Sequence, residues 1–148
     1  MATSDEVRLV VPAMPEYLRL ARVTAAGLAS RLGFSFDEVE DLRLAIDELC
    51  YGLTGNTGRP GTVEVRYMVA TDSLVIEGEG HFEPALGGEP TTEAKLPELS
   101  QVILAALVDE HALSDGADGP RFRLVKRRER GHTEQAGAPE QGRNSATS

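Results

Sequence analysis

The sequence predicts a two-layer α/β sandwich in which helices cover one face of a mixed β-sheet. Three features of the chain indicate this fold: an N-terminal strand pattern, two consecutive amphipathic helix patterns, and two strand patterns that a short turn joins as a hairpin. A last helix pattern and a last strand pattern complete the order. Because a hairpin is antiparallel, this order does not fit a doubly wound parallel sheet.

Proline and glycine residues mark the ends of the first predicted strand and the first predicted helix. Residues 6–11, EVRLVV, are rich in β-branched side chains and stop at Pro12, which predicts a strand at or near a sheet edge. Pro15 suits the first turn of a helix, and Gly33 closes it. Apolar residues with helical spacing form one face of this helix: Leu18, Ala21, Ala25, Leu28 and Leu32.

The second helix begins with a capping-box pattern. Ser35 is the expected N-cap, and the side chain of Glu38 is expected to reach back to its backbone. The predicted buried stripe of this helix consists of Leu42, Ala45 or Ile46, Leu49 and Leu53.

The C-terminal half of the domain adds a hairpin, a loop, a helix and a strand. Alternating apolar side chains on both sides of the Thr71-Asp72 turn predict the hairpin over residues 62–77. The other predicted elements are a glycine- and proline-rich loop over residues 78–95, a helix over residues 97–111 and a strand over residues 121–127.

The chain divides into one domain and a tail. Residues 1–127 carry every strand and helix pattern and are long enough to bury a single core. Residues 128–148 contain no Leu, Ile, Val, Phe, Tyr or Met, so they cannot bury enough apolar surface to offset the entropy of ordering. We therefore expect a disordered tail over residues 128–148.

The charge and the composition narrow the possible partners. The formal net charge is −9 and the pI is near 4.8, whereas nucleic-acid binding relies on clustered Lys and Arg, so a basic protein partner fits better. The chain has one cysteine and shows no signal-peptide or membrane-span pattern. We therefore predict a cytoplasmic protein that binds neither nucleic acid nor membrane.

Several kinds of catalytic site are not indicated. The three histidines lie far apart in the sequence, and no Cys or His pair has the spacing of a metal site. The segment GEGHFEPALGG matches neither common glycine-rich phosphate motif. Cys50 lies in an apolar stretch, where a small buried hydrophobe is the expected role in preference to a nucleophile.

The adjacent acids Asp47 and Glu48 admit two interpretations. They can be solvent-facing helix acids, with Arg43 and Asp47 as an i,i+4 ion pair. They can instead be functional residues, and the pattern alone leaves both interpretations open.

Residues 10–50, from VVPAMPEYLRLARV to DLRLAIDELC, closely resemble the first third of the anti-sigma factor family of the RsbW, SpoIIAB and UsfX type. These are small members of the GHKL ATPase and kinase fold that sequester a sigma factor. The likeness continues in FEP, ALVDE and RLVKR, and it covers about residues 6–127. It implies a Bergerat-type GHKL fold, a homodimer and a cytoplasmic regulator of transcription.

The resemblance assigns a role to Glu48. Active relatives carry Glu-x-x-x-Asn on the second helix, where the glutamate helps to activate the attacking serine hydroxyl and the asparagine binds magnesium. This chain has Glu48 at the first position and Gly52 at the second. The resemblance therefore implies that the magnesium ligand is lost and that Glu48 is a relic of the catalytic base.

Two further nucleotide motifs of the family are altered. The Asp-x-Gly-x-Gly motif that holds adenine falls on residues 77–81, where Glu77 replaces the aspartate and Glu79 replaces the first glycine. The Gly-Leu-Gly motif, whose amides meet phosphate at a helix N-terminus, falls on residues 98–100 and ends in Ser100. The resemblance implies a degenerate ATP site, as in the UsfX-like branch.

The resemblance also implies a partner-binding face. The family run Ala-Arg-Val-Thr is kept at residues 21–24, and its arginine is Arg22. Helical spacing places Arg22 at the margin of the buried stripe with its guanidinium reaching solvent, and Arg19 lies one turn earlier. We expect both arginines to contact the sigma factor and its antagonist.

Two functions of different classes follow. The first is an anti-sigma factor for a stress- or sporulation-type sigma factor, released by a STAS-domain anti-anti-sigma factor and needing no cofactor. The alternative is an ATP-Mg-dependent serine/threonine protein kinase that phosphorylates this antagonist. Gly52 and Glu79 are the features that separate the two.

Overall fold

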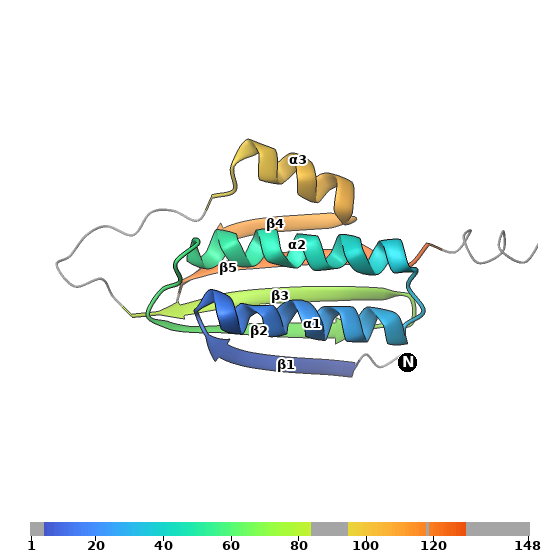
Figure 1. The fold of residues 1–148 in the computed structure, drawn as a ribbon, viewed down its shortest axis with the longest axis horizontal. Helices are drawn as coiled ribbons and strands as arrows, with labels where there is room; N and C mark the ends of the chain where they lie inside the picture. Colours follow the sequence, from blue (N-terminus) through green and yellow to red (C-terminus); the bar gives the residue numbers. More distant parts are fainter. Residues whose placement is uncertain (1–4, 84–94, 118, 130–148) are drawn as a thin grey trace, which may run out of the picture.

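The computed structural model describes residues 5–83, 95–117 and 119–129, which form a sheet and a layer of helices (Figure 1). In chain order the elements are β1 (Asp5–Pro12), α1 (Pro15–Arg31), α2 (Phe36–Thr54), β2 (Gly61–Val69), β3 (Ser73–Phe82), α3 (Glu98–Leu107), β4 (Glu110–Asp115) and β5 (Pro120–Arg127). The predicted α/β sandwich with helices on one face is confirmed. Within these residues, no helix is long and apolar enough to cross a membrane.

The sheet is antiparallel throughout the described residues. Its strand order is β1-β2-β3-β5-β4, and every neighbouring pair is antiparallel, so the expectation of a mixed sheet is wrong. β3 and β4 run in the same direction, as a crossover through α3 requires, but they are not neighbours. β5 inserts between them and is antiparallel to both.

The differences from the predicted elements arise in two segments. The sequence predicts helix as far as His111, but α3 ends at Leu107 and the residues EHALSD form β4. These residues contain no β-branched side chain, so their strand is specified by pairing with β5 and not by local preference. Residues 78–82, predicted as loop, extend β3 because Gly78 leaves room for the ring of Phe122, which a Cβ would strike.

The core lies between the sheet and the helices α1 and α2. The predicted stripe of α2 is fully confirmed, since Leu42, Ala45, Ile46, Leu49 and Leu53 are all buried. On α1 the fully buried face consists of Leu18, Ala21, Ala25 and Ala29, whereas Leu28 and Leu32 are only partly buried. The small side chains of α1 let it approach the sheet closely, and Tyr67 donates a hydrogen bond to the carbonyl oxygen of Ala21 at 2.9 Å.

The predicted capping box opens α2 and also holds the end of the domain. Ser35 Oγ accepts from the Glu38 amide at 3.1 Å, and Glu38 Oε1 accepts from the Ser35 amide at 2.7 Å. The second oxygen of the buried Glu38 carboxylate accepts from the Glu129 amide at 2.7 Å. The first two residues of the predicted tail therefore join the fold. The remainder, residues 130–148, lies outside the described residues, and its disorder remains a prediction.

Candidate functional site

Glu48 and Gly52 lie one turn apart on α2, on the flank that faces α3 and β4. A Cβ atom at Gly52 would lie 3.1 Å from Leu113 Cδ2 and 3.3 Å from Leu96 Cδ2. Leu96 is buried, and Leu113 packs against the core from β4. Apolar side chains therefore fill the space beside the position where active relatives carry the magnesium ligand.

This leucine contact bears directly on ATP-Mg. Magnesium in proteins is held by oxygen ligands at near-octahedral geometry, and neither Gly52 nor the two leucines can supply a side-chain oxygen. Sequence reasoning missed Leu96 and Leu113 because neither belongs to a nucleotide motif. Of the Glu-x-x-x-Asn motif, this chain retains only the glutamate, Glu48, which is half-buried on the same flank. The residues around Gly52 therefore do not supply the magnesium ligand that the family motif carries at this position.

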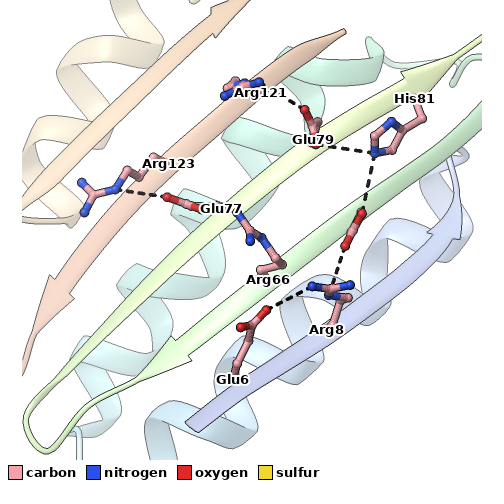
Figure 2. A network of polar contacts seen from close by, with 9 residues as sticks. Glu6, Arg8, Arg66, Glu77, Glu79, His81, Arg121 and Arg123 are labelled. Carbon is pink, nitrogen blue, oxygen red and sulfur yellow. Dashed lines mark hydrogen bonds and ion pairs between the residues drawn. The ribbon is translucent and has the colours of Figure 1, made fainter. Parts of the chain in front are cut away.

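Glu77 and Glu79 lie on the opposite face of the sheet from α2. Their side chains alternate along β3 with Leu74, Ile76 and Gly78, which are buried beneath the helices. Figure 2 shows both glutamates on the open face of the sheet. The expectation that Glu79 lies in a loop is therefore wrong, because β3 continues through it and turns its carboxylate away from the helices.

The open face carries a network of exposed ion pairs around these glutamates (Figure 2). Glu77 pairs with Arg66 at 2.8 Å and with Arg123 at 3.4 Å, and Glu79 pairs with Arg121 at 3.3 Å. A hollow of about 480 Å³ lies among these side chains. Each glutamate already pairs with arginine at the surface. We therefore interpret this face as a set of cross-strand ion pairs that contribute modestly to the stability of the fold.

Ser100 lies in the first turn of α3. The helix begins at Glu98, close to the predicted start, and Pro97 at its N-cap provides no side-chain cap. The predicted phosphate motif therefore does lie at a helix N-terminus, but it begins with a carboxylate. Glu98 suits the positive end of the helix dipole itself, and it would repel a phosphate there.

Arg22 does not simply extend into solvent. Its Nη1 donates to Asp47 Oδ2 of α2 at 2.8 Å, and its side chain is 29% exposed. The Arg43–Asp47 pair, which belonged to one of the two interpretations left open, does not form, because Arg43 instead pairs with Glu40 at 3.4 Å. Asp47 faces α1 across the helix–helix contact, so the arginine of the neighbouring helix reaches it. Arg19 is exposed one turn before Arg22.

Cys50 is buried within the same helix, as predicted. Burial, and secondarily the charge of Asp47, raises the pKa of its thiol to about 12. A thiol with this pKa stays protonated at neutral pH, which agrees with the expected role of Cys50 as a small buried hydrophobe.

Comparison with known proteins agrees with the fold and the resemblance. The sequence profile of the histidine kinase-like ATPase domain matches residues 11–126. The chain is 34% identical over 122 residues to the serine-protein kinase RsbW of Bacillus pumilus, covering 79% of this chain and 71% of that protein. The chain belongs to the RsbW family of histidine kinase-like ATPase domains.

Other RsbW-family matches are shorter. The serine-protein kinase RsbW of Bacillus subtilis is 37% identical over 82 residues, which cover 52% of this chain and 51% of that protein. This chain therefore aligns with about half the length of that relative. A crystal structure of RsbU and RsbW domains from Mycobacterium tuberculosis matches with a TM-score of 0.59 at 17% identity, covering 85% of this chain and 32% of that one. This likeness supports the fold alone.

Proposed function

We propose that this RsbW-family chain is an anti-sigma factor that sequesters a stress- or sporulation-type sigma factor without using nucleotide. The observation that carries the proposal is the packing of Leu96 and Leu113 against Gly52. A kinase of this family needs a metal ligand at that position, whereas sequestration of a partner needs only a docking surface. In this proposal the complex is cytoplasmic, acts as a homodimer, and is released by a STAS-domain anti-anti-sigma factor.

The docking surface in this proposal includes Arg22 and Arg19 on α1. Arg22 is held at the contact between α1 and α2 by Asp47, so part of its ordering cost is already met before a partner binds. A planar guanidinium with free donors suits a carboxylate of the partner. Exposed apolar side chains of the two helices, including Val23 and Leu44, surround the pair and would be covered in a complex.

The second candidate is the ATP-dependent serine/threonine kinase. Glu48 retains the carboxylate expected of its base, and the 34%-identical relative is named a serine-protein kinase. This function requires the leucines to leave the neighbourhood of Gly52 when nucleotide binds. The kinase function therefore needs a rearrangement of the leucines that the anti-sigma function does not need.

Calorimetric titration with ATP and magnesium tests the absence of nucleotide binding. We expect no saturable heat, and no rise in melting temperature, because only a ligand that binds the native state stabilises it by mass action. RsbW of Bacillus subtilis, titrated under the same conditions, is the positive control. A saturable isotherm for this chain would favour the kinase.

Pull-down with each purified sigma factor encoded in the same genome tests sequestration. We expect one of them to form a stable complex in the absence of nucleotide. If none binds, with or without ATP-Mg, the anti-sigma proposal fails.

A further inference from the structure

The exposed side of α3 is apolar. After Glu98 the helix contains no charged side chain, and within this fully described helix only Leu104 is buried. Leu99 is 70% exposed and Val102 is 66% exposed. A helix that is apolar on all sides is normally covered on all sides. The outward side of α3 is therefore a surface that a further element would cover.

The exposed apolar residues of α3 form one strip. At 100° per residue, positions 99, 102 and 106 fall within about 60° of one another, and Leu104 lies on nearly the opposite side of the helix. Ala106 is exposed, as are Leu99 and Val102. The strip therefore runs along most of the helix.

The outward ridge of α2 extends this strip. α2 and α3 pack side by side in the helix layer (Figure 1). Leu44 and Tyr51 are both exposed on α2, and they lie two turns apart on its outward side. Gly52, the neighbour of Tyr51, packs against Leu96 just before α3 begins, so Tyr51 lies near the start of α3. The α2–α3 surface consists of Leu44, Tyr51, Leu99, Val102 and Ala106.

The charges of these two helices are negative. Their one basic residue is Arg43, and their acidic residues are Asp37, Glu38, Glu40, Asp41, Asp47, Glu48 and Glu98. On α1, by contrast, arginines outnumber acids. A surface of one charge attracts a partner of the opposite charge and repels one of its own. The α2–α3 surface therefore favours a cationic partner.

Two of the acids beside this surface are available to a partner. Asp41 and Asp47 are already paired with basic side chains of the chain itself. Glu48 and Glu98 form no ion pair with another described residue. Glu48 lies one turn from Leu44, and Glu98 directly precedes the strip on α3. Apolar residues and unpaired carboxylates therefore lie next to each other.

We infer that the α2–α3 surface docks an amphipathic helix that carries Lys and Arg along the border of its apolar side. Leu99, Val102 and Tyr51 are the apolar anchors of this contact. Glu48 and Glu98 face the basic side chains of the docked helix.

The sigma factor of the proposed function supplies this helix. A protein that binds promoter DNA carries basic helices, because affinity for DNA relies on Lys and Arg. Leu44 belongs both to the α2–α3 surface and to the apolar surroundings of Arg22, so one partner can contact both. The inference rests on the proposed function only in this assignment, since a model peptide tests the chemistry of the surface by itself.

Binding of a model peptide tests that chemistry. The peptide LKKLLKLLKKLLKL forms a helix with one apolar and one basic side, and LEELLELLEELLEL is its acidic counterpart. Fluorescence anisotropy with the full chain should show saturable binding of the basic peptide and none of the acidic peptide. Absence of binding by the basic peptide, or equal binding of both, would overturn the inference.

Substitutions at the anchors locate the binding. Leu99→Lys and Val102→Lys should each weaken binding of the basic peptide at least about tenfold, since each removes an apolar contact and adds a like charge. Phe36→Lys is the matched control, because Phe36 is 77% exposed and begins α2 at the end remote from Gly52; it should leave the affinity unchanged. Circular dichroism verifies folding. Equal affinities of all three variants would overturn the docking surface.

Light scattering tests whether a second copy occupies this surface instead. Leu99→Lys and Val102→Lys should leave the oligomeric state as it is in the wild type. If both variants dissociate a wild-type dimer and Phe36→Lys does not, α3 is an interface between copies and the inference is overturned.

Removal of the unpaired acids tests the electrostatic part. Glu48→Gln and Glu98→Gln should each weaken binding of the basic peptide at low salt, and the difference from wild type should shrink at high salt because ions screen exposed charges. Glu79→Gln makes the same change on the open face of the sheet and should leave binding unchanged. An equal loss in all three variants would show that only net charge acts, which would overturn the role of the two acids.

Titration with the sigma factor found by pull-down tests which partner supplies the helix. Leu99→Lys should weaken sigma binding at least about tenfold, and Phe36→Lys should not. Unchanged sigma affinity together with lost peptide binding would overturn the assignment to the sigma factor. If no sigma factor binds the wild-type chain, the proposed function fails, whereas the peptide still decides the chemistry of the α2–α3 surface.

Discussion

The two flanks of α2 make contacts of opposite chemical character. The flank toward α1 carries a polar contact, in which Asp47 holds Arg22 at 2.8 Å near the surface. The flank toward α3 and β4 carries an apolar contact, in which Leu96 and Leu113 press against Gly52. Both positions lie on one helix less than two turns apart. In the function proposed above, partner recognition through Arg22 and the former nucleotide position lie on separate flanks of this helix, so variants can test each one independently.

The polar flank is tested first, because we expect its effect to be the largest. Arg22→Glu should weaken sigma-factor binding by about 2–5 kcal/mol, since it removes a charge-assisted contact and places a like charge before the partner's carboxylate. Titration with the sigma factor found by pull-down measures this change. Arg121→Glu, the same reversal on the open face of the sheet, is the control and should bind normally. Equal affinities for wild type and Arg22→Glu would place the docking surface elsewhere.

The apolar flank is tested by restoring the family residue. Gly52→Asn should destabilise the fold by about 1–3 kcal/mol, because the new side chain must displace Leu96 and Leu113. Urea unfolding measures the change. Gly27→Asn on α1 is the matched control, because no atom other than those of its chain neighbours and the surrounding helix backbone lies within 4 Å of its Cβ position; it should change stability by less than about 0.5 kcal/mol. A neutral Gly52→Asn variant would show that this flank retains room for a ligand.

The ion pair between Asp47 and Arg22 should contribute less to the stability of the fold than the packing around Gly52. Asp47→Ala removes a partly exposed ion pair and should destabilise the fold by about 0.5–1 kcal/mol. It should weaken sigma binding only slightly, because Arg22 remains but loses the contact that orders it. Glu40→Ala removes the more exposed i,i+3 pair with Arg43 and should cost under about 0.5 kcal/mol. If Asp47→Ala abolished binding without unfolding the chain, Asp47 would itself be part of the docking surface.

The smallest effect at neutral pH concerns Cys50, beneath the polar flank. Its pKa is raised in the folded chain from 9.0 to about 12. The protonated thiol therefore contributes its full share of stability below pH 9.0, and this share falls as pH rises toward 12, because the unfolded thiol ionises first. Urea unfolding should show a shallower alkaline decline for Cys50→Ala than for wild type. Equal slopes would contradict the raised pKa.

The local elements were predictable where their signals are local. The Ser35 and Glu38 capping box and the buried stripe of α2 depend on residues three or four apart, and both are confirmed. β4 was not predictable, because EHALSD has no strand preference of its own and pairs with a strand that follows it. The far end of β3 was missed for a related reason, since its glycines suggested a loop while they accommodate Phe122.

The candidate site shows the same division. The sequence by itself determined which residues stand at the altered nucleotide motifs, and the family resemblance identified them. It could not place Glu77 and Glu79 on the face opposite Glu48, because that depends on the strand phase of β3.

Contacts between distant parts of the chain were decided only by the tertiary structure. Arg22 meets Asp47 across two helices, and Gly52 meets Leu113 of β4. Helix periodicity and capping depend on interactions between residues that are close in the sequence, so a sequence pattern indicates them directly. Strand order and side-chain partners depend on which surfaces the folded chain brings together, and local pattern does not encode that choice.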